Sequence, residues 1–356
     1  MTRETKILKK EQLEQFLDGL IRERTVFAPT KRDNERLFGA IGSAQGTSIE
    51  AGTTKNSLKS ALFPQTERLF LYRQTGEGVE TEVPPEEKEL VLFGIRPCDA
   101  RSLVLLDGVF QSGIEDPYFS GKRKRSLVIA MACATPDGAC FCTAVGGSPC
   151  ATEGSDLLLL DLGDRYLVEA ATDKGKEIVK DRLFEATDEK DLAEGEKFKA
   201  KAEAAMDGKV SDAPMTGKTL EEGLKEVFDD PLWEELTETC MSCGVCTYLC
   251  PTCHCFDICD ETALTGGERI RIWDSCQFPL FTRQASGFNP RPTGRERFRQ
   301  RIMHKFSYLP ENGNITGCVG CGRCVTECPV NLDIREVVSK LARRTSMPAE
   351  KEIEAR

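Results

Sequence analysis

The stretch that decides the fold is Cys240-Met-Ser-Cys-Gly-Val-Cys-Thr-Tyr-Leu-Cys-Pro251, and it recurs 78 positions later as Cys318-Val-Gly-Cys-Gly-Arg-Cys-Val-Thr-Glu-Cys-Pro329. Each copy has the spacing Cys-x2-Cys-x2-Cys-x3-Cys-Pro, which is typical of polypeptides that hold two [4Fe-4S] clusters. In such a run the first three cysteines bind one cluster, and the fourth binds the other. Two runs therefore predict two clusters with crossed ligands.

The crossed pattern predicts two sets of four thiolate ligands, and a chain with two such clusters is expected to transfer electrons. The first set is Cys240, Cys243, Cys246 and Cys328, and the second set is Cys318, Cys321, Cys324 and Cys250.

A structural zinc site is the main alternative to the two clusters. Zinc sites use two Cys-x2-Cys pairs separated by a longer loop, and three closely spaced cysteines with a delayed fourth fit that pattern poorly. Gly244 and Gly322 also stand at the same place in both runs. A glycine lets the backbone approach a cluster and direct N–H groups at sulfur, and such hydrogen bonds help to set the reduction potential.

Composition places the chain among ordinary globular proteins. Its 356 residues are enough for two domains, and its 17 cysteines are not preceded by an apolar export signal, because residues 1–10 are polar and charged. We therefore expect a cytoplasmic protein with reduced thiols. The apolar stretches are too short to cross a bilayer, which predicts no direct membrane insertion. A net charge of −10 argues against nucleic-acid binding, which needs a basic surface.

The N-terminal part combines strands and helices. Apolar periodicity predicts helices over 11–23 and 99–110, strands over 25–29, 69–72, 89–93 and 126–131, and a hairpin over 156–172 that turns at Gly163-Asp164. Lys, Glu, Asp and Ala dominate residues 185–218, which indicates a solvated helix followed by a linker. We predict an α+β protein, with a mixed α/β domain over 1–210 and a mostly helical, ferredoxin-like domain over 211–356.

The second domain is expected to hold the cysteine runs between helices. The predicted helices are 219–228, 232–238, 295–305 and 332–344. A separation of 78 residues between the runs is too long for a compact bacterial ferredoxin. It suits an arrangement in which helices bridge the two cluster-binding turns.

Four further cysteines predict an additional iron-sulfur site in the first domain. Cys98 and Cys133 each follow a buried strand, and Cys140 and Cys142 lie in the loop after the second of these strands. Ligands commonly lie at the ends of neighbouring strands, so these four thiols are candidates for a third [4Fe-4S] cluster. The alternative is that they are ordinary buried cysteines. Cys150 is interpreted as a loop residue.

The other cysteines and a basic stretch leave two interpretations each. The cysteines Cys253, Cys255, Cys259 and Cys276 either pack around the second cluster or bind a non-standard cluster. The basic residues either form a solvated helix that pairs with acidic neighbours, or lie beside the anionic clusters and raise their potentials. These basic residues are Arg291, Arg295, Arg297, Arg299, Arg301 and Lys305.

Beyond residue 90 the chain resembles the iron-sulfur β subunits of sulfhydrogenases and the corresponding iron-sulfur subunit of anaerobic sulfite reductase. The segments that carry the resemblance are Gly94-Ile-Arg-Pro-Cys-Asp99, Cys140-Phe-Cys142, residues 240–257, Arg271-Ile-Trp-Asp-Ser-Cys-Gln277, Arg297-Phe-Arg-Gln-Arg301 with His304-Lys305, and residues 318–324. The first 85 residues carry little of it.

The resemblance implies a non-catalytic electron-transfer subunit of a larger oxidoreductase. Its implied partners are a flavin- and [2Fe-2S]-containing subunit that binds NAD(P)H, and a hydrogenase, sulfite reductase or heterodisulfide-reductase-type module. FAD and NAD(P) would then be bound by the partner subunits. In agreement, the sequence has no Gly-x-Gly-x-x-Gly after a strand, no P-loop and no cysteine pair arranged to hold nickel. The alternative is a structural adaptor whose clusters carry no electrons.

Overall fold

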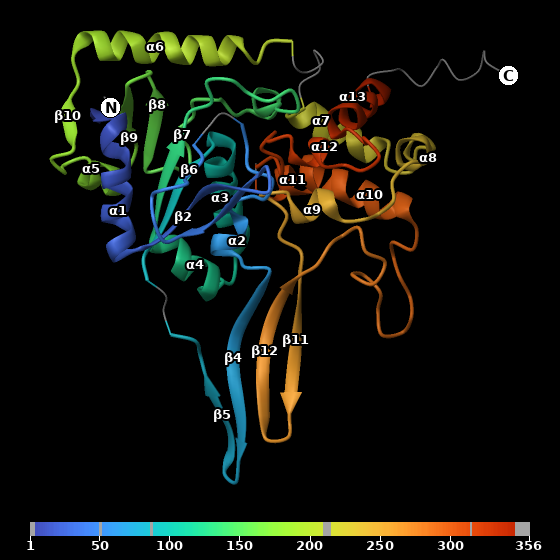
Figure 1. Cartoon of the computed structure of the whole chain (residues 1–356). Helices are drawn as coiled ribbons and strands as arrows, with labels where there is room; N and C mark the ends of the chain where they lie inside the picture. The colour runs from blue at the N-terminus through green and yellow to red at the C-terminus, as the bar shows by residue number, and fades with distance from the viewer. Residues whose placement is uncertain (1–3, 50–51, 86–87, 209–214, 314, 346–356) are drawn as a thin grey trace, which may run out of the picture. The chain divides into compact units, whose positions relative to one another are not determined.

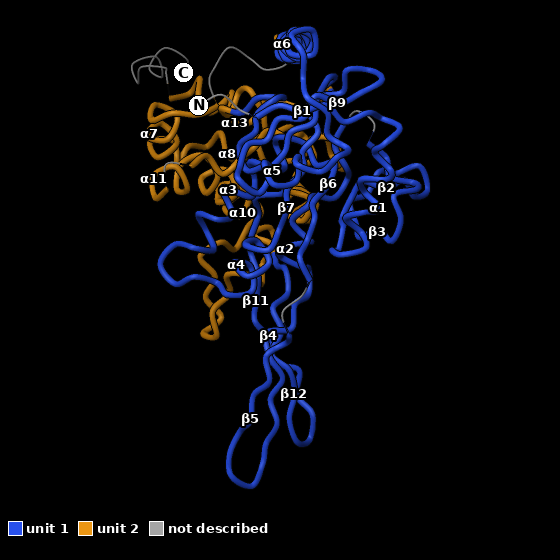
Figure 2. The backbone as a smooth tube through the Cα atoms, turned by 90° about the vertical axis from the view of Figure 1, so that its left-hand side faces the viewer, with its two compact units in different colours: residues 1–137, 147–206, 251–274 blue, residues 138–146, 207–250, 275–356 orange. Residues whose placement is uncertain are grey.

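The computed structural model describes residues 4–49, 52–85, 88–208, 215–313 and 315–345, which form two compact units (Figure 2). Unit 1 consists of residues 1–137, 147–206 and 251–274, and unit 2 consists of residues 138–146, 207–250 and 275–356. The predicted linker near residue 210 lies outside the described residues. Both units therefore contain chain segments from either side of that predicted boundary.

Unit 1 is built on an eight-stranded mixed sheet with the strand order β10-β1-β9-β8-β7-β6-β2-β3. The strands β2, β6, β7 and β8 are parallel neighbours, whereas the outer pairs are antiparallel. The carboxyl ends of β6 and β7 therefore meet at one edge of the sheet. The bounds are β1 Glu4–Lys9, β2 Thr25–Arg32, β3 Glu35–Ile41, β6 Leu90–Ile95, β7 Ser126–Met131, β8 Leu157–Asp161, β9 Arg165–Ala170 and β10 Phe184–Ala186.

Apolar side chains cover both faces of this sheet. Every residue of β6 is buried, and along it Leu92 and Phe93 belong to separate core clusters, as the alternation of side chains in a strand requires. Helix α3 packs on the face of Leu92, and helix α1 packs on the face of Phe93. The helical elements of unit 1 are η1 Lys10–Gln12, α1 Leu13–Glu23, α2 Lys59–Leu62, α3 Pro97–Phe110, α4 Pro117–Lys124, α5 Asp173–Ile178 and α6 Glu189–Ala204.

A second sheet of four antiparallel strands, here called the ribbon, belongs to the same unit. Its order is β11-β12-β4-β5, and it extends away from the large sheet (Figure 1). The hairpin β11–β12 comes from the chain between the two cysteine runs, so the prediction of a helical bridge missed this part. The strands are β4 Thr66–Thr75, β5 Gly78–Glu82, β11 Phe256–Ala263 and β12 Gly266–Trp273.

Buried charges fix the base of the ribbon to the rest of unit 1. Arg271 on β12 is only 2% exposed, and its Nε donates to Oε2 of Glu67 on β4 over 3.1 Å. Lys122 on α4 also pairs with Glu67, and Asp116 pairs with Arg271. The four side chains alternate in sign, which offsets the cost of removing each charge from water.

Unit 2 is helical and encloses one apolar core. Trp233, Phe298 and Leu341 are among its buried residues, and each comes from a different helix. The helical elements are η2 Cys142–Val145, α7 Lys218–Glu226, α8 Leu232–Thr237, α9 Val245–Tyr248, α10 Gly294–Met303, the π-helix η3 His304–Tyr308, α11 Leu309–Gly313, α12 Arg323–Thr326 and α13 Ile334–Thr345.

These elements confirm the predicted fold class of a mixed α/β region followed by a mostly helical one. The strand over 126–131 and the hairpin turning at Gly163-Asp164 are present as predicted. Within the described part of the chain, none of the helices has the length and apolar character needed to span a membrane.

Candidate metal centres

The two cysteine runs repeat in conformation as well as in sequence. In both runs the third and fifth positions have positive φ angles, 52° and 77° at Ser242 and Gly244, and 65° and 79° at Gly320 and Gly322. A non-glycine residue rarely adopts such a conformation. The left-handed backbone of Ser242 is therefore held by its surroundings, and it makes the first loop the same shape as the second.

Each loop ends in a short helix that is capped in the same way. The carbonyl oxygen of Gly244 accepts hydrogen bonds from the N–H groups of Thr247 and Tyr248, at 2.9 and 3.1 Å. The carbonyl oxygen of Gly322 accepts from Val325 and Thr326, at 2.9 and 3.0 Å. This turn separates the first three cysteines of each run from the fourth.

The first predicted set of thiols lines one pocket in unit 2. Cys328, from the second run, lines this pocket together with the first three cysteines of the first run. Cys324 lines it too, so the two sets adjoin. Much of the remaining wall is apolar. The lining residues include Cys240, Cys243, Cys246, Cys328, Phe298, Leu332 and Ile334.

The second predicted set also gathers within unit 2. Burial raises the pKa of the Cys318 thiol to about 11, the ammonium group of Lys305 acts in the opposite direction, and the neighbouring Cys250 and Cys321 raise it. Burial likewise raises the pKa of Cys324, as do the charges of the other three thiols of the set. The structure therefore places Cys250 with the second run, which is the crossed grouping that the spacing predicts.

The two sets differ in exposure. Cys250, Cys318 and Cys321 are buried, whereas Cys243 in the first set is exposed. Backbone N–H groups reach sulfur in both sets, from Gly320 to Sγ of Cys318 over 3.5 Å and from Leu332 to Sγ of Cys328 over 3.2 Å. Soft thiolate donors, left-handed loops and N–H groups directed at sulfur are the features that hold iron-sulfur clusters. The residues present therefore fit a [4Fe-4S] cluster at each site.

A site for one metal ion differs in geometry from a cluster site. Across the residues with a described placement, no group of three or more His, Cys, Asp or Glu side chains is arranged to hold one metal ion. The thiolates of a four-iron cluster bind at four different iron corners and lie further apart than the ligands of one ion.

A segment from the first half of the sequence packs on the second cysteine run. We call residues 138–146 the strap, and they belong to unit 2. The N–H of Phe141 donates to the carbonyl oxygen of Gly320 over 2.8 Å. A Cβ atom on Gly320 would lie 2.5 Å from the backbone of Phe141 and Cys142, and one on Gly322 would lie 2.7 Å from the backbone of Ala139. Glycine at both positions lets the strap lie directly against the loop.

The predicted third set is divided between the two units. Cys98 begins α3 after β6 and Cys133 follows β7, so both lie at one edge of the large sheet in unit 1. Cys140 and Cys142 lie on the strap in unit 2. Cys150 is buried, and the N–H of Cys133 donates to the carbonyl oxygen of the adjacent Pro149 over 2.9 Å. The four thiols are therefore not gathered within one unit.

The remaining four cysteines also divide. Cys276 belongs to unit 2, and its charge raises the pKa of Cys246, so it lies near the first set of thiols. The other three, Cys253, Cys255 and Cys259, belong to unit 1. The expectation that Cys276 packs around the second cluster therefore needs correction.

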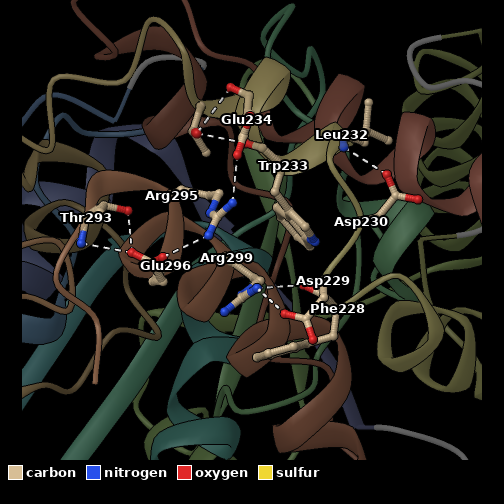
Figure 3. A network of polar contacts seen from close by, with 11 residues as sticks. Phe228, Asp229, Asp230, Leu232, Trp233, Glu234, Thr293, Arg295, Glu296 and Arg299 are labelled. Carbon is tan, nitrogen blue, oxygen red and sulfur yellow. Dashed lines mark hydrogen bonds and ion pairs between the residues drawn. The ribbon is translucent and has the colours of Figure 1, made fainter. Parts of the chain in front are cut away.

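The basic stretch on α10 satisfies both interpretations of it. Arg295 and Arg299 pair with Glu234 and Asp229, at 2.8 and 3.1 Å (Figure 3). Three other basic residues are buried, and Arg301 and Lys305 contact the cysteine runs. These three are Arg297, Arg301 and Lys305, with exposures of 9%, 3% and 4%. Their spacing of four residues is a helical signal that separates them from the outward arginines.

Sequence reasoning also missed Gln277 and Phe278. Gln277 lines the first pocket and donates from Nε2 to the carbonyl oxygen of Arg297 over 3.0 Å. Phe278 covers Gly244, where an added Cβ would lie 2.9 Å from its ring. They follow Cys276 directly, but that position shows no spacing that connects them to the first run.

Comparisons with known proteins agree with this site. A family model described as a 4Fe-4S dicluster domain matches residues 239–332, which contain both cysteine runs. Sulfhydrogenase 2 subunit beta of Pyrococcus furiosus is 31% identical over 342 residues, which cover 94% of this chain and 97% of that protein. No solved structure matches the chain.

Proposed function

We infer that this chain, which belongs to the family of the sulfhydrogenase beta subunits, is an iron-sulfur subunit that relays single electrons within a multi-subunit oxidoreductase. The observation that carries this inference is the crossed grouping of the cysteines. Cys328 joins the first run and Cys250 joins the second. Crossed ligation of this kind is how two-cluster ferredoxins bring two redox centres close together.

The proposed ligands are the two sets described above, Cys240, Cys243, Cys246 and Cys328 for the first cluster, and Cys318, Cys321, Cys324 and Cys250 for the second. A bound [4Fe-4S] cluster supplies a one-electron couple. The protein supplies four thiolates at each site, donates backbone N–H groups to sulfur, and excludes water from the second site by burying three of its thiols. These are the protein's means of setting a reduction potential.

A third cluster held by Cys98, Cys133, Cys140 and Cys142 remains a proposal. Its support is the placement of two of these thiols at one sheet edge and of the other two on the strap. Because the strap bonds to the loop of the second run, a third cluster that uses Cys140 and Cys142 would neighbour the second cluster. The electron path would then run from the third cluster through the second to the first, or in the reverse direction.

The proposed partners follow from the family. We propose that electrons are exchanged with a flavin- and [2Fe-2S]-containing subunit that binds NAD(P)H, and with a hydrogenase, sulfite reductase or heterodisulfide-reductase-type subunit. FAD and NAD(P) would be bound by those subunits, and the cytoplasm is the expected compartment. Purification of the intact complex under anaerobic conditions, followed by identification of the accompanying chains, tests this assignment.

A redox titration distinguishes an electron carrier from a structural adaptor. The anaerobically purified chain should contain about eight iron atoms in two clusters, or about twelve with the third. Its visible absorbance should bleach on reduction and return on oxidation, with EPR signals from the reduced clusters. An adaptor predicts clusters that no physiological reductant can reduce. Replacement of Cys246 by Ser should remove or destabilise the first cluster and slow electron flow through the complex.

A further inference from the structure

We propose that Arg301 and Lys305 are two buried cations that each raise the reduction potential of one cluster, Arg301 that of the first and Lys305 that of the second. This inference rests on the proposed function, because it assumes a cluster at each site. It assigns a separate positioning residue to each redox centre and places both on one helix.

The helix presents the two cations on one face. Arg301 lies in α10, and Lys305 follows four residues later in the π-helix η3 that continues it. Residues four apart are neighbours on one side of a helix. Single π-helical turns occur frequently at functional sites, where the wider turn redirects a side chain. Both side chains are almost fully buried, at 3% and 4% exposure.

Arg301 reaches the first set of thiols. Its Nη2 donates to the carbonyl oxygen of Cys246 over 3.1 Å, and its side chain lines the pocket that contains Cys240, Cys243 and Cys328. Burial raises the pKa of the Cys246 thiol, and the charge of Arg301 opposes that rise. A guanidinium group in this position favours negative charge on the sulfur atoms around it.

Lys305 reaches the second set. Its Nζ donates to Sγ of Cys250 over 3.4 Å and to the carbonyl oxygen of Gly317 over 2.8 Å. The second bond lies one residue before Cys318 and holds the ammonium group beside the loop. Lys305 also opposes the rise in the pKa of Cys318 that burial causes.

The outward arginines of the same helix provide a contrast. The guanidinium group of Arg299 lies 3.1 Å from the carboxylate of Asp229 and stacks on the ring of Phe228 (Figure 3). Arg295 lies 2.8 Å from the carboxylate of Glu234. Their charges are balanced by carboxylates near the surface. The contacts of Arg301 and Lys305 described above go instead to carbonyl oxygens and thiol groups.

The expected effect follows from charge. Reduction adds one negative charge at a site that already carries about −2 from the cluster and its thiolates. A fixed cation in a water-poor site stabilises the reduced form more than the oxidised form. Each buried cation should therefore make its own site easier to reduce, and should act less on the other site.

The test uses the full chain, purified anaerobically with its clusters. Lys305→Met and Arg301→Met remove one charge each, and Arg299→Met is the matched control on the same helix. Potentiometric titration followed by EPR gives the midpoint potential of each cluster. Cys243→Ala and Cys321→Ala variants assign the two signals to their sites, because each removes a ligand of one set.

We expect Lys305→Met to lower the reduced-to-oxidised ratio of the second cluster about tenfold at a given potential, which is about 59 mV for one electron. Arg301→Met should do the same to the first cluster, and Arg299→Met should shift neither. Lys305→Arg, which keeps the charge, should restore the potential. This variant also decides the case in which Lys305→Met loses the second cluster.

The inference is overturned if the potentials of Lys305→Met and Arg301→Met match the unaltered chain, if Arg299→Met shifts them equally, or if Lys305→Arg shifts the potential as far as Lys305→Met. Failure of the proposed function has a different result. In that case the unaltered chain itself contains no clusters, or clusters that cannot be reduced, before any variant is compared.

Discussion

The backbone N–H of Phe141 donates a hydrogen bond to the carbonyl oxygen of Gly320 over 2.8 Å. This bond joins the strap, which lies far upstream in the sequence, to the loop of the second cysteine run. Phe141 itself is 1% exposed and packs in the core of unit 2 with Phe298 and Trp233. The loop that presents Cys318 and Cys321 is therefore supported by a segment that carries two further cysteines, Cys140 and Cys142.

Gly320→Ala should break this support. The φ angle of 65° is unfavourable for alanine, and the new Cβ would lie 2.5 Å from the backbone of the strap. We expect a loss of at least about 2 kcal/mol in the free energy of unfolding, with reduced iron occupancy at the second site. Gly287→Ala is the control, because Gly287 has a φ angle of 84° but nothing within 4 Å of an added Cβ. That change should cost about 1 kcal/mol and no iron. Equal losses would show that the strap contact is unimportant.

Arg271→Met should destabilise unit 1 strongly. It leaves the carboxylates of Glu67 and Asp116 buried or partly buried without their guanidinium partner. Breaking a buried ion pair in this way costs about 3–5 kcal/mol. Arg269 stands two residues earlier on the same strand, and its pair with Asp260 is exposed. Arg269→Met should therefore cost no more than about 1 kcal/mol in denaturant unfolding, and a similar cost for both variants would contradict a structural role for the buried network.

Local patterns predicted the elements whose side chains are periodic. The strand Ser126–Met131 is entirely apolar after its first residue and bounded by charged and polar residues, so its sequence was sufficient. The strand β5 is exposed along its whole length, and therefore has no apolar alternation to detect. The hairpin β11–β12 was missed for a related reason, because most of β11 is exposed and the strand that pairs with β12, β4, lies almost 200 residues away.

The candidate sites show the same division. The spacing of the cysteines was enough to propose the grouping of Cys328 with the first run, because a known local geometry determines it. The contact between the strap and Gly320 is a backbone interaction between distant segments, and no side-chain pattern announces it. The roles of Arg301 and Lys305 depend on which face of α10 is buried, and that is decided by the packing of unit 2.

Tyr166 should make unit 1 sensitive to alkaline pH. Burial, with a smaller contribution from the charge of Asp161, raises the pKa of its hydroxyl to about 12, whereas the unfolded chain ionises near 10. Its contribution to stability is therefore absent below pH 10, and the unfolded state gains by ionising as the pH rises from 10 toward 12. At pH 11 the resulting loss of stability should be about 1.4 kcal/mol. Tyr166→Phe should remove it, so the stability of the variant should fall less steeply between pH 9 and 11. Parallel curves would contradict this assignment.

Cys328→Ala and Cys250→Ala test the crossed ligation directly. Cys328 belongs to the second run in sequence but lines the pocket of the first. Cys328→Ala should therefore remove the EPR signal that Cys243→Ala removes, with a loss of about four iron atoms per chain. Cys250→Ala should remove the signal that Cys321→Ala removes, since the charges of Cys250 and Cys321 both act on the Cys318 thiol.

A control separates ligand loss from general damage to the thiols. Cys259 lies on β11 in the ribbon, where its Sγ contacts the carboxylate of Asp257 at 3.8 Å. Cys259→Ala should leave both signals and the iron content unchanged. If Cys328→Ala instead abolished the signal assigned by Cys321→Ala, each run would bind its own cluster. The pocket shared by Cys328 and the first run would then have no role in ligation, and the basis for assigning Arg301 to the first cluster would have to be rebuilt around Cys246 alone.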